Sequence, residues 1–301
     1  MSSSLRPGFW REALTFRGSV TPKITPHVAV FGAFATLICI LSRCIESYYQ
    51  TKLSLEVWPH EIAGAALGLL LILRTNAGHS RWWEARKLWG GIVNQSRNLI
   101  IGALAYGPAD PEWRQEFSKW AAAFPHIARL SLRGERTRTD LVRLLGEEDA
   151  TMVMNAEHMP SLVAMKLAEL LRDACERFDM DRFAFLRIDK ERAELIDHLG
   201  ACERILKTPL PMVYAIKVRR FILVFLLTLP LALLHRMSGE WMVPIITMMV
   251  AYPLIALDQI GVELQNPFAT VNLSHLPLND ISQTIEGNVK GLLKNTACVL
   301  N

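Results

Sequence analysis

Four apolar runs along the 301-residue chain constrain its fold more than any other feature of the sequence. They cover residues 28–41, 62–73, 221–234 and 241–257. A membrane-spanning helix needs about 20 predominantly apolar residues. The first run is short, but its helix can continue to Tyr49, because tyrosine suits the membrane interface. The second run is too short to span alone. We nevertheless interpret the four runs as four transmembrane helices.

The remainder of the chain also has the periodicity of helices. A hydrophobic content of 51% and a mean hydropathy of +0.20 are high for a soluble protein and low for one buried wholly in lipid. Apolar residues recur at three- and four-residue steps in residues 117–130, 163–178, 188–206 and 281–293. No alternating pattern typical of strands competes with them. The sequence therefore predicts an all-α protein with membrane helices and a cytosolic helical region.

Basic residues flank the apolar runs on one side only. They precede the first run, follow the second and precede the third, whereas the links 50–61 and 235–240 carry few of them. Because short cytoplasmic loops are enriched in Lys and Arg, we expect both termini in the cytoplasm. The predicted regions are a cytosolic segment 1–26, two membrane helices in 27–74, a cytosolic helical region 75–217, two membrane helices in 218–258 and a cytosolic tail 259–301 packing on the helical region. The net charge of +4 reflects this topology and does not indicate a nucleic-acid partner.

Motifs for enzymatic chemistry are missing from the sequence. It has no GxxxxGK[ST], GxGxxG, HExxH or GxSxG pattern, and its eight histidines are scattered. The five cysteines form no CxxC pair, so they predict neither a disulfide framework nor a zinc site. We expect a chain without cofactor or metal that is not an enzyme.

The second apolar run has a pattern that suits a pore. Gly64 and Gly68 share one helix face, which permits close approach of helices. Ala65, Leu69 and Leu73 share the adjacent face at four-residue steps. In a symmetric oligomer with this helix at the axis, these side chains would form apolar rings that gate by dewetting. Ordinary helix packing is the alternative explanation of the same pattern.

The segment RTNAGHSRWWEARKLWGG, residues 74–91, follows this run directly. Its tryptophans and basic residues fit the inner membrane interface. Arg74, Asn76, Arg81 and Glu84 are candidates for charge-assisted bonds that anchor the base of the helix. The alternative is a solvated helix start at the interface.

This segment resembles a motif of the bestrophin family, in particular of its bacterial members. Three further stretches agree in type and order: TPLPMVY at 208–214, ELQNPF at 263–268 and LPLNDISQTIE at 276–286. The order of the four apolar runs and the long helical insert also match. The resemblance covers about residues 10 to 290.

The resemblance implies a homopentameric ion channel of the bacterial inner membrane with one axial pore. It assigns the neck to Ala65, Leu69 and Leu73, where family members usually carry Ile and Phe, and a cytosolic aperture to Leu210. Membrane lipids and monovalent ions are the implied partners. Chloride or another anion is the expected ion. A sodium-type cation channel and a non-conducting membrane scaffold are the alternatives.

Animal bestrophins have a calcium clasp after the fourth span, built from backbone carbonyls near NPF and a run of aspartates. Here no carboxylate occurs between Phe268 and Asp280. Calcium requires several oxygen ligands, usually including carboxylates. We therefore expect no calcium gating, and only a structural role for Asn266.

Overall fold

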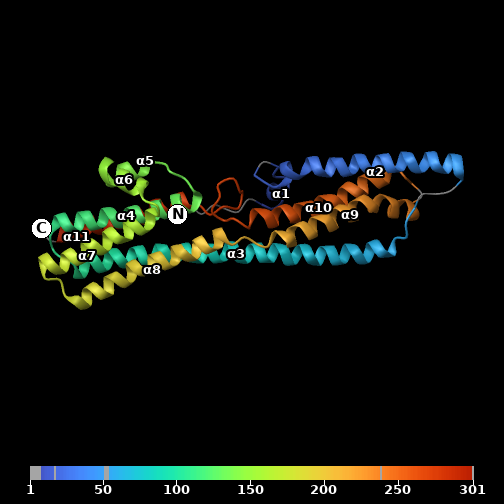
Figure 1. Cartoon of the computed structure of the whole chain (residues 1–301). Helices are drawn as coiled ribbons and strands as arrows, with labels where there is room; N and C mark the ends of the chain where they lie inside the picture. The colour runs from blue at the N-terminus through green and yellow to red at the C-terminus, as the bar shows by residue number, and fades with distance from the viewer. Residues whose placement is uncertain (1–7, 17, 51–53, 238, 300–301) are drawn as a thin grey trace. The chain divides into compact units, whose positions relative to one another are not determined.

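The computed structural model describes residues 8–16, 18–50, 54–237 and 239–299, and in these ranges it is helical without any strand (Figure 1). This confirms the all-α prediction. Parts of the predicted terminal regions, residues 1–7, 17 and 300–301, lie outside the described residues. The chain divides into two compact units. The first comprises Met1–Trp82, Pro209–Asn266 and Val271–Ser274, and the second Trp83–Thr208, Pro267–Thr270 and His275–Asn301.

The first unit contains the apolar helices. They are α2 (Thr21–Tyr49), the first part of α3 (Trp58–Tyr106), α9 (Met212–Arg236) and α10 (Met242–Glu263), preceded by the short α1 (Phe9–Ala13). Helices α2, α9 and α10 lie side by side (Figure 1). Within the described residues α2, α3 and α10 are long and apolar enough to cross a membrane. The sequence predicts α9 as a further span, so a total of four stays a prediction.

Helix α3 is one continuous helix of 49 residues. The short apolar run 62–73 is therefore only its middle part, and the expected alternative of a new helix start near Arg74 is wrong. No proline interrupts residues 60–106, so nothing in the sequence ends the helix where the apolar run stops. The length of the apolar run consequently underestimated the length of the helix.

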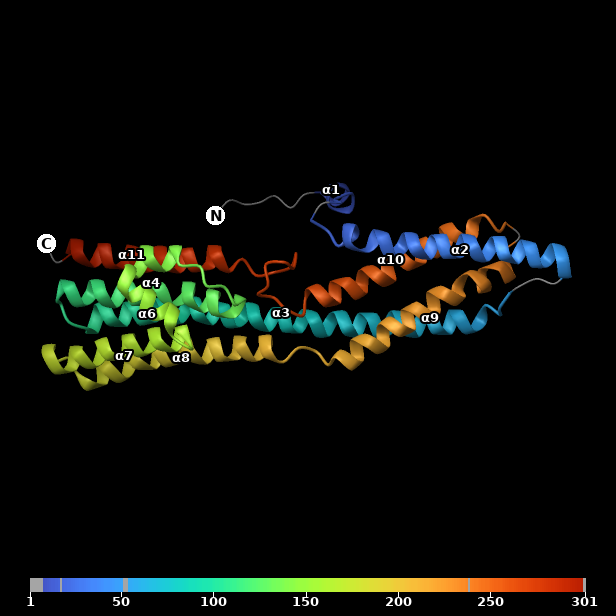
Figure 2. The same cartoon turned by 45° about the horizontal axis from the view of Figure 1, so that its top comes forward.

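The second unit is built around α4 (Pro111–Arg133), which is buried without interruption from Trp120 to Leu130. It contacts α5, α7, α8 and α11. Figure 2 shows α11 running alongside it. These helices and α6 have the bounds α5 Thr139–Leu145, α6 Glu147–Asn155, α7 Met159–Phe178, α8 Arg182–Lys207 and α11 Leu278–Val299. Asp110 accepts a hydrogen bond from the backbone N–H of Trp113 at 2.7 Å, which caps the start of α4. All four periodic segments predicted from the sequence are helices.

A buried carboxylate attaches α11 to the rest of the second unit. Glu286 accepts two hydrogen bonds from Arg143, at 2.6 and 2.8 Å, and one from Lys290 at 2.6 Å. His126 Nε2 on α4 lies 3.0 Å from the same carboxylate. The hydrogen bonds from Arg143, opposed by burial, lower the pKa of Glu286 from 4.5 to about 2. The ionised form of Glu286 therefore stabilises the folded unit.

The first prediction concerns this carboxylate. Because the folded-state pKa is depressed, its stabilisation is complete above about pH 4.5 and is lost as the pH falls toward 2. Partial exposure of Arg143 and Lys290 limits the contribution to about 1–2 kcal/mol at neutral pH. We expect Glu286→Gln to speed amide hydrogen exchange in α11 about tenfold at neutral pH. In the variant, the protection of α11 should also fall less as the pH is lowered from 4.5 toward 2. Lys294→Gln, an exposed charge on the same helix, is the control. Equal protection of α11 in Glu286→Gln and in the unaltered protein would contradict this assignment.

Candidate functional site

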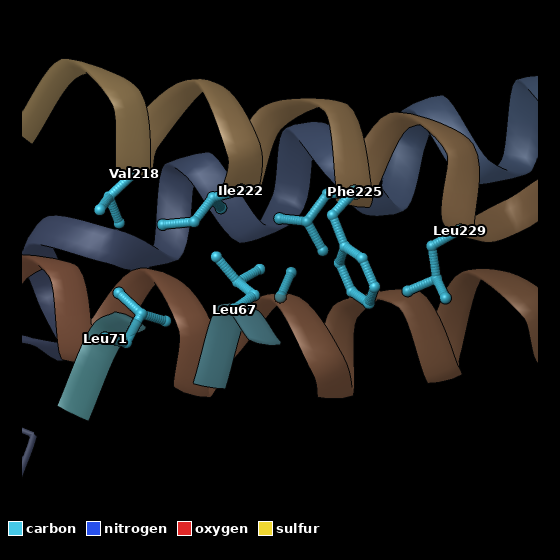
Figure 3. Packing of buried hydrophobic residues seen from close by; sticks show 8 residues of the cluster. Leu67, Leu71, Val218, Ile222, Phe225 and Leu229 are labelled. Carbon is cyan, nitrogen blue, oxygen red and sulfur yellow. The ribbon is translucent and has the colours of Figure 1, made fainter. Parts of the chain in front are cut away.

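Helix α3 has two apolar faces in the membrane part of the chain, and only one of them is covered. Leu67 and Leu71 are fully buried and pack against α9, where Ile222 and Phe225 point toward them (Figure 3). On the other side of α3, Leu69 is 58% exposed and Leu73 is 52% exposed. Ala65, one turn before Leu69, is exposed as well. The predicted neck residues therefore form an outward apolar stripe on a helix whose opposite face is fixed to α9.

The two glycines differ in their surroundings. A Cβ on Gly64 would lie 3.4 Å from the ring of Phe225, so this position lies in the contact between α3 and α9. A Cβ on Gly68 would meet no atom within 4 Å. Within one copy of the chain, the close approach expected of both glycines occurs at Gly64 and does not occur at Gly68.

Arg74 lies one residue beyond the stripe and is almost completely buried, at 1% exposure. Its Nη1 donates to Oδ1 of Asp258 on α10. Arg219 on α9 donates through Nε to the other oxygen of the same carboxylate at 2.9 Å. The Nε and Nη2 groups of Arg74 have no hydrogen-bond partner among the described residues. Asp258 is thus the counter-charge that holds three helices of the first unit together.

Two glycines lie in the contact between α3 and α10 beside this pair. A Cβ on Gly78 would lie 3.1 Å from Cβ of Leu264 and 3.4 Å from the carbonyl oxygen of Gly261. A Cβ on Gly261 would lie 3.5 Å from Cγ and Nε of Arg74. Helices α3 and α10 therefore approach closely along the side chain of Arg74.

The other predicted anchors lie in different surroundings. The Nε of Arg81 donates to the carbonyl oxygen of Gln265 at 3.5 Å. Glu84, in the second unit, accepts from Nη2 of Arg204 at 3.1 Å. Asn76 is exposed. The structure does not gather these residues with Arg74 into one cluster. Leu210, the predicted aperture residue, is half-buried just before α9 begins.

Sequence reasoning missed Asp258 and named Arg74 without a partner. A signal was present, because an ionisable side chain near the end of an apolar run needs a counter-charge. The sequence places several basic residues near the ends of the apolar runs. Spacing alone does not select Arg74 among them, because it lies 184 residues from Asp258.

The segment after α10 is held by a second buried carboxylate. Glu263 is 2% exposed and accepts from Nζ of Lys23 at 2.5 Å and from the backbone N–H of Leu273 at 2.6 Å. The carbonyl oxygen of Asn266 accepts from Nδ2 of Asn272 at 2.9 Å. Over the ranges that the structure describes, no three His, Cys, Asp or Glu side chains gather as metal ligands.

Comparisons with known proteins identify one family of membrane channels. A family model described as Bacterial/Fungal Bestrophin protein matches residues 1–291. A voltage-dependent anion channel-forming protein of Ralstonia nicotianae is 31% identical over 291 residues, covering 95% of this chain and 92% of that protein. A protein of the same description from Synechocystis is 29% identical, covering 97% and 94%. The crystal structure of a bacterial bestrophin homologue from Klebsiella pneumoniae has a TM-score of 0.81 and 26% identity, covering 90% of this chain and 98% of that one.

Proposed function

The chain belongs to the family of bacterial and fungal bestrophins, and from this premise we propose that it forms an anion-conducting membrane channel. Relatives that cover nearly all of the chain are named as anion channel-forming proteins. Their names also confirm the prediction that the chain is not an enzyme. The channel is a homo-oligomer. We further propose that five copies surround one axis, that the protein lies in the bacterial inner membrane and that both of its termini are cytoplasmic.

The outward stripe of α3 is the observation that carries the proposal. Leu69 and Leu73 are large apolar side chains left more than half exposed in one copy. Residues 65 to 73 extend over about 12 Å of helix, at 1.5 Å per residue. Five copies of this stripe around an axis would form the rings of a narrow apolar neck at Ala65, Leu69 and Leu73. Such rings control ion passage through the cost of dehydration.

Fixed charge next to the stripe favours anions. Arg74 and Arg219 share the single carboxylate of Asp258, so two positive charges face one negative charge and one positive charge remains. This excess lies within one residue of Leu73 in sequence. Electrostatic potential from fixed charges adds to the dehydration barrier that an ion meets. We therefore propose monovalent anions such as chloride as the permeant ions.

Two finer parts of the proposal concern the cytosolic side. Leu210 would form the aperture, a role that rests on the family resemblance. The channel would open without calcium. In support of this, both oxygens of the Glu263 carboxylate already accept hydrogen bonds, one from the ammonium group of Lys23 and one from the backbone N–H of Leu273.

Reversal potentials test the proposed function. Purified protein in a planar bilayer under a KCl gradient should reverse near the equilibrium potential of chloride. Adding or chelating calcium should leave the current unchanged. Reversal near the potassium potential would contradict anion selectivity, and a silent bilayer containing intact oligomer would contradict the channel itself and favour a scaffold.

A further inference from the structure

A cavity of about 340 Å³ lies between α2, α9 and α10 in the first unit. Its polar lining consists of Lys23, His27, Arg219, Asp258 and Gln259, and its apolar lining includes Phe31, Leu223 and Ile255. It is separate from the outward stripe of α3, because no residue of α3 lines it.

All three helices change from polar to apolar in the same direction along this cavity. On α2, Lys23, His27 and Phe31 follow each other at four-residue steps, so they share one face. On α9, Arg219 and Leu223 are separated by four residues. Helix α10 runs in the opposite sense relative to the proposed membrane, and there Ile255 precedes Gln259 by four residues. The distance along α2 from Lys23 to Phe31 is about 12 Å.

The cationic groups are held in place and yet remain accessible. Lys23 is fixed by Glu263, and its side chain is 43% exposed. Arg219 is fixed by Asp258 through Nε at 2.9 Å, and its side chain is 55% exposed. Its Nη groups make no hydrogen bond to the described residues, so they are free to donate to an anion. Lys23, Arg74 and Arg219 share the two carboxylates of Asp258 and Glu263, so this connected group of side chains at the polar end of the cavity has one positive charge in excess.

We propose that this cavity binds a phospholipid with a singly charged anionic headgroup. The phosphate lies at Lys23, His27 and Arg219, and one acyl chain follows Phe31, Leu223 and Ile255. A small free anion would leave the apolar part of the cavity uncovered, whereas a phospholipid matches both parts. The inference rests on the proposed orientation, which puts the basic ends of α2 and α9 at the cytoplasmic leaflet, where such headgroups attract Lys and Arg.

Native mass spectrometry of the assembled protein tests this site. Phosphatidylglycerol and phosphatidylcholine with the same acyl chains are titrated separately, and glycerol phosphate is added in a third series. We expect phosphatidylglycerol to bind more tightly than phosphatidylcholine, and glycerol phosphate to bind more weakly than either lipid. Arg219→Gln should weaken binding of phosphatidylglycerol about fivefold. Arg220→Gln, which removes the adjacent exposed charge outside the cavity, should leave it unchanged.

A second pair of variants tests the apolar part without touching either ion pair. Leu223→Trp fills the cavity, whereas Val224→Trp adds the same ring at a neighbouring exposed position that does not line it. Binding of phosphatidylglycerol should fall in the first variant only, with the oligomer mass intact in both. Equal binding of the two lipids, equal losses in each matched pair, or glycerol phosphate binding as tightly as the lipid would overturn the proposal. Mass spectrometry measures lipid binding independently of ion conduction. An absence of lipid binding would therefore leave the channel proposal intact, and an absence of current would leave the lipid proposal intact.

Discussion

Replacing Leu69 and Leu73 together by alanine is expected to raise anion flux about tenfold, equivalent to lowering the barrier by about 1.4 kcal/mol. Alanine removes most of each apolar side chain from the outward stripe of α3, so the proposed neck becomes wider and easier to wet. The measurement is chloride efflux from liposomes, normalised to the amount of reconstituted oligomer. The folded state should tolerate the change, because both side chains are more than half exposed in one copy.

The matched control for this variant removes similar apolar volume from α9. Val224 is 58% exposed and Leu227 is 37% exposed, and neither belongs to the α3 stripe. Val224→Ala combined with Leu227→Ala should leave efflux within about twofold of the unaltered protein, a change worth only about 0.4 kcal/mol in a barrier. Unchanged efflux after alteration of Leu69 and Leu73, or an equal rise in the control, would remove these leucines from the neck.

The largest expected effect on stability comes from Asp258→Asn. This change leaves the guanidinium of Arg74 buried at 1% exposure without its counter-charge. Removing one partner of a buried ion pair typically costs about 3–5 kcal/mol. We expect a lower midpoint of thermal unfolding in detergent and a smaller fraction of assembled oligomer in size-exclusion chromatography.

Two further variants test whether the loss of stability comes from the unpaired charge of Arg74 or from a general disturbance of the site. Arg219→Gln removes the half-exposed partner and should cost less than about 1 kcal/mol. Arg74→Met combined with Asp258→Leu removes both buried charges and should recover much of the stability lost in Asp258→Asn. If Asp258→Asn is as stable as the unaltered protein, or if the double variant is no better than the single one, Asp258 does not hold Arg74 in the way described.

Most of the fold follows from local patterns in the sequence. Periodicity located α4, α7, α8 and α11 of the second unit, because each is long enough to repeat its apolar positions over several turns. It did not locate α5 and α6, which are only 7 and 9 residues long. Apolar runs located the four long helices of the first unit, whereas the five-residue α1 was not predicted. The continuous α3 was missed because its apolar part stops at Leu73, whereas no proline ends the helix before Tyr106.

The arrangement around the candidate neck required the structure. Four-residue spacing put Ala65, Leu69 and Leu73 on one face, but Leu67 and Leu71 are equally apolar, and nothing local says which face packs against α9. The partner of Arg74 lies 184 residues away. Pairings across such distances depend on how helices pack, which periodicity does not encode.

Thiol modification at position 69 tests most directly whether the outward face of α3 lines the ion pathway. Leu69→Cys is recorded in a bilayer in a background with the exposed Cys44 replaced by serine, alongside Val224→Cys on α9. A bulky water-soluble thiol reagent should abolish the anion current of Leu69→Cys and leave that of Val224→Cys intact. A full current through protein that mass spectrometry shows to be modified at position 69 would contradict the pore that we propose.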